Sequence, residues 1–510
     1  MLFEDTAFFG MARTGSIEGK IRYPGLMNKD DVMSLRMDAG TNAYSINQFR
    51  INWMETDDLV IIPDAIIKIQ RPGLLLRTLE EIFRKVGYRK LIYAQGIGDP
   101  YLIPSLVYCG ISLFDDLYIS SQSSEGVIFG ALGKRKGVER DPFDDNLKFT
   151  EEILQMTSEG IKNRTLREMV EKFTISSKAV EILRLLDNRY HAQSEIGYPV
   201  RTPYLKANST ESLSRPDLER FRKYVSEQYR RPEAKNTALI IPCSAKKPYS
   251  SSRSHQSLIQ SLGRMRDGIH EIIVTSPVGV VPRDLEETYP ARFYDIPVTG
   301  KWSEDEKMML KNTLSSFFSN NTYDHVFCLI KEELDFIEES LPESHTVIHG
   351  RIDNQEDQAK LKSEIARKTV LNHSRCDCRR ESMLQMASYQ FGNWIVKEIA
   401  DSRILRNYNQ YMFTNGGKVQ LVFNQEKGMF SINKSFAATF VKNNRFVVSI
   451  DDFKPTSEVY AVGVTGATED VRIEGEIVMS HEGEARGTGT AKMTPQAMVE
   501  LNKGVAVKVR

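Results

Sequence analysis

The sequence has few cysteines, no long apolar run and no excess of charge. Five cysteines are scattered over 510 residues, and an odd, dispersed set does not make the disulfide framework of a small secreted domain. No apolar run approaches the roughly 20 residues that span a bilayer. The N-terminus has neither the basic start nor the apolar core of a signal peptide. We therefore expect a protein of the reducing cytoplasm that does not enter a membrane.

The charges cancel, because 68 basic side chains balance 68 acidic ones. This balance argues against a protein that coats nucleic acid nonspecifically, although a local basic face would suffice for a specific complex. The chain carries no P-loop pattern, tandem repeat or low-complexity tract. Its length exceeds one ordinary core, so we expect about three to four domains.

Composition and periodicity divide the chain into four expected domains of an α/β multidomain protein. Residues 1–233 mix short strands with amphipathic helices, residues 234–371 form an α/β core, residues 372–428 form a small α+β linker, and residues 429–510 form a barrel of about six strands. In the core, strand and helix patterns alternate, which predicts βαβ units and a parallel sheet. The predicted strands are 59–62, 90–94, 238–241, 271–275, 325–330 and 346–349.

The residues directly after the predicted strand 238–241 form the most informative stretch. Positions 242–255 read P-C-S-A-K-K-P-Y-S-S-S-R-S-H. Ligands bind outside the carboxyl ends of strands in open α/β sheets. A thiol, two amines, a phenol, several hydroxyls and an imidazole within fourteen positions therefore predict a site.

Five residues of this stretch are candidates for catalysis. Cys243 is either a nucleophile whose pKa is lowered by nearby cations such as Lys247, or a small buried hydrophobe. Tyr249 and His255 could transfer protons, although a lone histidine is often structural. Ser252 is either a ligand contact or a turn residue.

Other segments offer substrate-binding candidates. We expect a rigid wall for a flat ligand, formed by Pro242 together with Ser276, Pro277, Val278 and Gly279. Acidic residues follow this segment, and they either contact substrate or begin a helix; the candidates are Asp284, Glu286 and Asp295. The aromatic phrase 289–302 is expected to line the same cleft.

The N-terminal and linker segments hold weaker candidates. Gly96 and Gly98 either bring backbone amides to a ligand or make a tight turn. Asp115 is either a functional acid or a helix cap. Cys376 and Cys378, with His373 nearby, are the zinc candidates, but structural zinc usually needs four ligands, so we expect no metal.

The pattern P-C-x3-K-P-Y-x2-S-x2-H resembles the signature of the archaeosine synthases, which are relatives of the tRNA-guanine transglycosylases. Seven defined positions agree in order and spacing. Segment 166–190 looks like the late part of a transglycosylase-like region, and segment 447–510 is similar to a PUA domain, a small β-barrel that binds RNA. The resemblance covers nearly the whole chain.

This resemblance implies a reduced transglycosylase-like (β/α) N-terminal domain that holds a nucleoside or tRNA. Asp115 stands where the nucleophilic aspartate of those enzymes would lie, and Asp38 loosely matches their second acid. Their zinc ligands are reduced to Cys376 and Cys378. The same resemblance implies no required cofactor, and a possible homodimer because transglycosylase relatives commonly dimerise.

The implied activity is addition of the amine of free lysine to the nitrile of 7-cyano-7-deazaguanine at position 15 of tRNA. The product would be an amidine-type adduct, which a radical SAM partner enzyme would convert to archaeosine. Chemically, the site needs an unprotonated amine, stabilisation of charge on the nitrile nitrogen and a proton donor. The alternatives are an active tRNA-guanine transglycosylase and a tRNA-binding subunit without catalysis.

Overall fold

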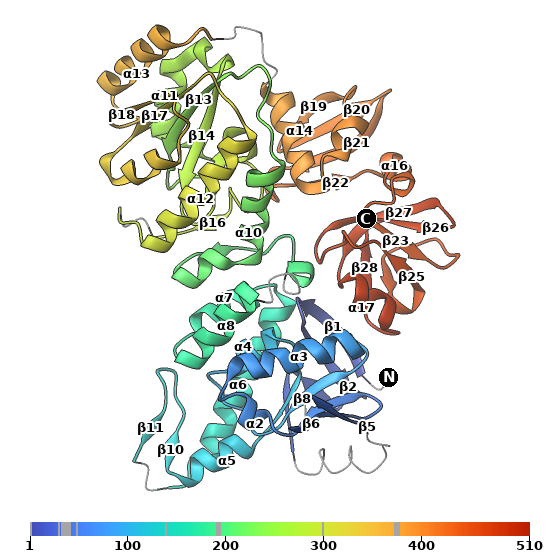
Figure 1. Ribbon diagram of the computed structural model, residues 1–510. Helices are drawn as coiled ribbons and strands as arrows, with labels where there is room; N and C mark the ends of the chain where they lie inside the picture. Colours follow the sequence, from blue (N-terminus) through green and yellow to red (C-terminus); the bar gives the residue numbers. More distant parts are fainter. Residues whose placement is uncertain are drawn as a thin grey trace. The chain divides into compact units, whose positions relative to one another are not determined.

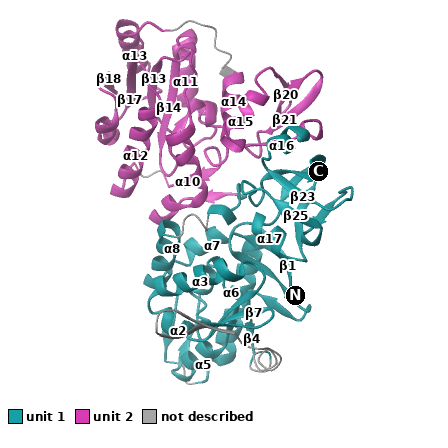
Figure 2. Ribbon diagram, turned by 45° about the vertical axis from the view of Figure 1, so that its right-hand side comes forward, with its two compact units in different colours: residues 1–203, 437–510 teal, residues 204–436 magenta. Residues whose placement is uncertain are grey.

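The computed structural model describes residues 3–28, 31, 42–46, 49–137, 140–189, 195–297, 300–371 and 378–510, with the backbone alone at 42–46, 49–52 and 378. Two compact units make up the chain (Figures 1 and 2): residues 1–203 together with 437–510, and residues 204–436. The chain therefore leaves the first unit and returns to it at Ala437. Within the described residues, no helix is long and apolar enough to cross a membrane.

The N-terminal part of the first unit contains two sheets. One is a three-stranded antiparallel sheet, and the other is a six-stranded mixed sheet in the order β4-β9-β8-β7-β6-β5. The strands are β1 (Phe3–Phe9), β2 (Ala12–Ile17), β3 (Ile21–Tyr23), β4 (Gly25–Met27), β5 (Asn42–Ile46), β6 (Phe49–Glu55), β7 (Leu59–Ile62), β8 (Leu91–Ala94) and β9 (Leu113–Asp115). The two strands predicted here are confirmed as β7 and β8, which pair in parallel.

Helices cover the six-stranded sheet and enclose an apolar core with it. They are α2 (Ala65–Lys68), α3 (Pro72–Val86), α4 (Ile103–Tyr108), α5 (Leu117–Ser124), α6 (Phe143–Lys162), α7 (Leu166–Lys172) and α8 (Ser177–Arg189), with a hairpin of β10 (Val127–Ile128) and β11 (Arg135–Lys136). The predicted break inside 166–190 is confirmed, since α7 ends and α8 begins there. Asp38 lies outside the described residues.

The C-terminal part of the same unit is a six-stranded sheet in the order β24-β28-β27-β26-β23-β25. Its elements are α16 (Ala437–Lys442), β23 (Val447–Ile450), β24 (Glu458–Tyr460), β25 (Val464–Ala467), β26 (Glu476–His481), β27 (Glu484–Ala491), α17 (Pro495–Glu500) and β28 (Val505–Val509). A second apolar core joins it to the N-terminal strands, for example Phe3 and Leu91 with Val448 and Met498. This shared core explains why the two ends of the sequence fold as one unit.

The second unit begins with β12 (Leu205–Lys206), α10 (Pro216–Lys223) and a π-helical turn (Tyr224–Gln228). Its main sheet has five strands in the order β15-β14-β13-β17-β18. The elements are β13 (Thr237–Pro242), α11 (Arg253–Leu262), β14 (Ile269–Thr275), β15 (Gly279–Pro282), β16 (Tyr294–Asp295), α12 (Glu304–Asn320), β17 (His325–Ile330), β18 (His345–His349) and α13 (Gln355–Lys368). Short 3-10 helices lie at Tyr249–Ser251, Arg283–Leu285 and Glu332–Ser340.

The predicted parallel sheet is present in this core. Strand β13 pairs in parallel with β14 and β17, β17 pairs in parallel with β18, and only the edge strand β15 runs antiparallel. Helices α11 and α13 contact each other, while α12 contacts the Glu332–Ser340 helix and β15 (Figure 1). Helices on both faces account for the nearly continuous burial of β13 and β14.

The remainder of the second unit contains α14 (Cys378–Phe391), α15 (Trp394–Glu398) and a four-stranded antiparallel sheet of β19 (Arg403–Asn407), β20 (Gln410–Asn415), β21 (Lys418–Asn424) and β22 (Met429–Ile432). The boundary expected between residues 428 and 429 falls inside this sheet. Strand β22 hydrogen-bonds to β21, so the sheet keeps it, and the first unit resumes only at Ala437.

Candidate functional site

A cavity of about 440 Å³ lies at the carboxyl ends of the parallel strands of the core. Its volume is in the range of small-molecule sites. Four strand ends contribute to its wall: β13, β14, β17 and β18. The lining residues are Pro242, Cys243, Ser254, Val274, Thr275, Ser276, Ile296, Pro297, Gly300, Lys301, Trp302, Glu306, Lys331, Glu333, Leu334, Gly350, Arg351, Ile352 and Asp353.

The strand order explains why the cavity forms at this point. The chain passes from β13 outward to β14, and later returns to β17 and β18 on the other side of β13. The connections after β13 and β17 therefore leave the sheet in opposite directions, which opens a crevice between their carboxyl ends. Cys243 follows β13 directly and lies at this crevice.

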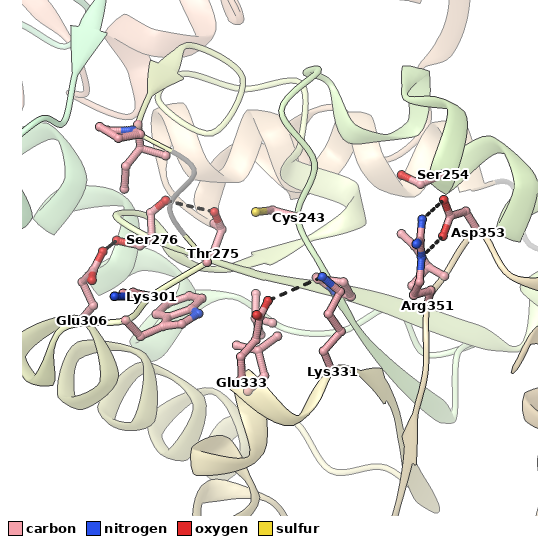
Figure 3. A pocket seen from close by; sticks show the side chains of 18 of the residues that line it. Cys243, Ser254, Thr275, Ser276, Lys301, Glu306, Lys331, Glu333, Arg351 and Asp353 are labelled. Carbon is pink, nitrogen blue, oxygen red and sulfur yellow. Dashed lines mark hydrogen bonds and ion pairs between the residues drawn. The ribbon is translucent and has the colours of Figure 1, made fainter.

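Cys243 presents its thiol to the cavity (Figure 3). Its backbone N–H donates to the Val274 carbonyl at 3.2 Å, which continues the pairing of β13 with β14 and fixes the position of the residue. Burial by the surrounding protein raises the pKa of the thiol, while a hydrogen bond with Thr275 and the charge of Lys247 lower it by less. The sequence predicted a thiol pKa lowered by nearby cations. The charge of Lys247 does lower it, but burial outweighs that effect, so the net shift is upward.

Lys247 interacts electrostatically with this thiol but is not among the residues that line the cavity. Its ammonium is 3.9 Å from the centroid of the Tyr294 ring, a cation–π distance. Burial lowers the pKa of Lys247, and the negative charges of Cys243 and Asp295 oppose that shift. A lysine of this kind can give up a proton more easily than one in water.

A chain of hydroxyl groups leads from the protein interior to Thr275. The Tyr249 hydroxyl is 2.9 Å from the Tyr294 hydroxyl, which is 2.6 Å from Thr275 Oγ1. Thr275 Oγ1 donates to the Ser276 carbonyl at 3.0 Å, and a hydrogen bond from Thr275 lowers the pKa of the Cys243 thiol. Tyr249 is completely buried and does not line the cavity. It therefore reaches the site only through Tyr294 and Thr275.

His255 lies behind the loop rather than in the cavity. It is fully buried at the start of α11, and its backbone N–H donates to the N-cap hydroxyl of Ser252 at 3.3 Å. Burial and the charge of Arg283 lower the pKa of His255 to about 4, with Glu271 opposing them. Arg283 Nη2 donates to His255 Nδ1 at 2.9 Å. A guanidinium can only donate, so the neutral ring carries its proton on Nε2.

Two of the three acids proposed as substrate ligands, Asp284 and Glu286, are also buried behind this loop. Asp284 accepts from the Tyr229 hydroxyl at 2.8 Å. Burial opposes its ionisation, but Lys235, His270 and Tyr229 outweigh that effect and lower the pKa of Asp284. Glu286 accepts from the Ser250 N–H at 2.9 Å and pairs with Arg283 at 2.8 Å. Both carboxylates thus have protein partners and do not line the cavity.

Of the expected wall 276–282, only Ser276 faces the cavity, together with Pro242 from the preceding strand. The Pro277 carbonyl accepts from Arg222 at 2.6 Å. Val278 is buried, and Gly279 opens the edge strand β15. Asp295 lies on β16, which pairs with β12. From the aromatic phrase, Gly300, Lys301 and Trp302 line the cavity with Cys243, as predicted.

Five charged lining residues were not among the candidates from the sequence. They are Glu306, Lys331, Glu333, Arg351 and Asp353. Glu306 occupies the third position of α12, where it accepts from the Ser303 N–H at 2.8 Å and from the Ser276 hydroxyl at 2.6 Å. The other four follow the ends of β17 and β18, so their position directly after predicted strands was the available signal.

Asp115 ends β9 in the other unit, where it is almost fully buried. Its carboxylate accepts from the Tyr93 hydroxyl at 2.9 Å, from the Gly96 N–H at 3.1 Å and from the Leu117 N–H at 3.2 Å. Burial raises the pKa of Asp115 despite these bonds. Gly98 packs against the Asp115 carbonyl so closely that a side chain would clash. This arrangement holds a turn.

The zinc candidates lie at the edge of, or outside, the described residues. His373 and Cys376 lie outside the described residues, and Cys378 is described only by its backbone at the start of α14. Among the described residues, no three His, Cys, Asp or Glu side chains are grouped to hold a metal ion.

Two segments of the chain match known protein families, and the chain as a whole is similar to known proteins. Residues 218–365 match the family described as "Domain of unknown function (DUF5591)", and residues 453–510 match the PUA domain. The protein is thus an α/β multidomain chain with a C-terminal PUA domain. A crystal structure of AF0587, a protein of unknown function, is 26% identical, covers 57% of this chain and 98% of its own, and has a TM-score of 0.47.

Two curated relatives extend over most of the sequence. Archaeosine synthase subunit alpha of Thermoplasma acidophilum is 46% identical over 100% of both chains. Archaeosine synthase subunit alpha of Methanosarcina acetivorans is 30% identical over 89% of this chain and 79% of its own. The seven-position motif that surrounds Cys243 thus belongs to a chain that is related to the first of these proteins along its whole length and to the second over most of it. The chain is therefore a member of the archaeosine synthase subunit alpha family.

Proposed function

We propose that this protein modifies tRNA by adding the amine of free lysine to the nitrile of 7-cyano-7-deazaguanine at position 15. Family membership and the PUA domain support tRNA as the partner. The observation that carries the chemistry is the Cys243 thiol, which lies in a cavity at the switch point of the α/β sheet and whose pKa is influenced by the charge of Lys247. A radical SAM enzyme would complete archaeosine formation.

The reaction releases no by-product and involves no change of oxidation state. The Cys243 sulfur bonds to the nitrile carbon, its proton passes to a neighbouring base, and the nitrile nitrogen gains a proton, which gives a thioimidate. The unprotonated lysine amine then bonds to the same carbon, and the C–S bond breaks to release the thiolate. The amine loses one proton to the thiolate, so the product is an amidine. No redox cofactor takes part.

Of the residues around the thiol, we assign one to proton transfer and the others to positioning. Lys247 stabilises the thiolate and, with its lowered pKa, exchanges a proton with the nitrile nitrogen. Thr275 holds the sulfur in line through its hydrogen bond. Tyr249 and His255 are fully buried, so we assign them to positioning the loop rather than to contact with substrate.

The base would lie on the side of the cavity that holds Trp302 and Glu306. An indole offers a stacking surface to an unpaired base. The Glu306 carboxylate is held by Ser303 and Ser276, and it can accept hydrogen bonds from the N–H groups of a guanine-like edge. This orientation directs the nitrile toward Cys243.

Replacing Cys243 tests the covalent route. The full-length protein is incubated with tRNA that carries the nitrile base, with and without lysine. Without lysine, wild type should form a protein–tRNA adduct on a denaturing gel, and Cys243→Ala should form none. With lysine, nucleoside mass spectrometry should show the gain of one lysine in wild type and in Cys109→Ala, which removes a buried thiol of the other unit. Near-normal turnover by Cys243→Ala would refute the covalent step.

The Asp115 geometry argues against the transglycosylase alternative. A nucleophilic carboxylate must approach the ribose, whereas this one is buried and accepts hydrogen bonds from Tyr93, Gly96 and Leu117. Exchange of labelled guanine into tRNA by the wild-type protein, abolished in Asp115→Asn, would establish that alternative. A non-catalytic subunit would show neither exchange nor lysine addition.

A further inference from the structure

Two similar ion pairs follow neighbouring strands and line one side of the cavity. After β17, Lys331 Nζ lies 4.0 Å from Glu333 Oε1. After β18, Arg351 Nε and Nη2 each donate to one oxygen of Asp353 at 3.0 Å. In each pair a cation is followed two residues later by an acid. Because β17 and β18 pair in parallel up to Ile330 and His349, the two pairs begin at the same edge of the sheet.

The Arg351–Asp353 pair shows what this edge can recognise. The arginine fork already holds a carboxylate side-on, the geometry in which guanidinium groups bind carboxylate ligands. The side chains of Arg351 and Asp353 are 66% and 41% exposed, so solvent screens the pair and little is lost when it opens. A ligand that carries both a carboxylate and an ammonium could open the pair: its carboxylate would bind Arg351 in place of Asp353, and its ammonium would bind Asp353 in place of Arg351.

The position of the pairs relative to the thiol sets the orientation of such a ligand. In the view of Figure 3, Arg351 and Asp353 lie on one side of Cys243, and Ser276, Lys301 and Glu306 lie on the other. All of them line the same cavity. An amino acid whose zwitterionic end binds at the strand ends would therefore extend its side chain toward Cys243.

We propose that Arg351 with Lys331 binds the α-carboxylate, and Asp353 with Glu333 binds the α-ammonium, of the amino acid substrate. This inference rests on the proposed lysine addition and deepens it, because it assigns the residues that distinguish lysine from other primary amines. In the view of Figure 3 the two cations, Lys331 and Arg351, lie between the two acids, Glu333 and Asp353, so a zwitterion bound there meets charges of both signs. The side-chain amine remains free to attack.

The test compares three amines that share the attacking group. Lysine has both α-groups, cadaverine lacks the carboxylate, and 6-aminohexanoate lacks the α-amine. The full-length protein is incubated with each amine and nitrile-bearing tRNA, and adducts are quantified by nucleoside mass spectrometry. Arg351→Ala should raise the KM for lysine about tenfold to a hundredfold, as for loss of a hydrogen bond to a charged group, and should abolish the preference over cadaverine. Asp353→Asn should abolish the preference over 6-aminohexanoate.

The control is Arg367→Ala, which removes an exposed arginine from a surface pair on α13 and should retain both preferences. If Arg351→Ala and Asp353→Asn turn over lysine but keep the wild-type discrimination, the assignment of these residues is wrong. If wild type adds lysine and cadaverine equally well, there is no zwitterion site. If wild type adds no amine to the nitrile, the proposed function fails and this inference fails with it, which separates the two cases.

Discussion

Replacing Arg283 with leucine should destabilise the α/β core far more than removing an exposed arginine. Arg283 is buried, with 9% of its side chain exposed. Its guanidinium donates to Glu271 at 2.8 Å, to Glu286 at 2.8 Å and to His255 at 2.9 Å. Leucine fills part of the volume but leaves two buried carboxylates without their main cation.

Breaking a buried ion pair in this way costs about 3–5 kcal/mol. At about 2–4 °C per kcal/mol for a domain of this size, the unfolding temperature of the second unit should fall by about 10 °C. The effect should also reach the site, because Glu286 accepts from the Ser250 N–H in the loop that follows Cys243. We expect a lower kcat with little change in the KM for lysine.

The deficit should depend on pH. Burial opposes ionisation of Glu271, but Arg283 and Arg266 outweigh it and lower the pKa of Glu271 to about 2. Against an ordinary value of about 4.3, this corresponds to about 3 kcal/mol of stability. A lowered pKa stabilises above the ordinary value, and the contribution is lost as the pH falls toward about 2. The variant lacks this contribution, so its difference from wild type should be full above about pH 4.5 and shrink as the pH falls from there toward about 2.

Calorimetry of wild type, Arg283→Leu and Arg367→Leu at several pH values measures these differences. Arg367 pairs with Glu364 on the surface, so its loss should leave the transition unchanged. Equal shifts for the two variants, or an Arg283→Leu deficit that grows as the pH falls, would refute the reasoning about the buried network.

Two further predictions concern the thiol and the shared core of the first unit. Thr275→Val keeps the shape of the side chain but removes the hydrogen bond that lowers the pKa of Cys243, so the pH–rate profile for lysine addition should move to higher pH. An unchanged profile would mean that the thiol does not control the rate. Glu500→Ala leaves the Tyr88 N–H without the carboxylate that accepts it at 2.7 Å, so it should cost about 1–3 kcal/mol in thermal unfolding. Glu484→Ala on the exposed β26–β27 hairpin is the matched control, and equal unfolding temperatures would contradict this role.

Local patterns in the sequence sufficed to locate the strands of the core and the loop that follows β13. Strands β7, β8, β13, β14, β17 and β18 overlap the predicted ranges. Each contains a short apolar run, and such runs can be recognised from neighbouring positions in the sequence. The same patterns favoured a site after β13, since parallel strands in βαβ units bring their carboxyl ends to one edge.

The burial of single side chains was decided by tertiary packing. Asp284, Glu286 and His255 have the residue types of a catalytic site, yet each has a partner within the protein. Asp284 accepts from Tyr229, while Glu286 and His255 both accept from Arg283. Arg351 and Asp353 look like ordinary surface charges in the sequence, yet they line the cavity. A single sequence does not state which polar groups satisfy one another and which remain open to a ligand.

The sequence by itself therefore determined the α/β core, the position of Cys243 at a strand end and the resemblance to archaeosine synthases, because these follow from short-range order along the chain. The tertiary structure decided that β17 and β18 place two ion pairs beside the same cavity. It also decided that the C-terminal PUA domain shares an apolar core with the N-terminal strands. Both depend on strand order and long-range burial, which are properties of the whole folded chain.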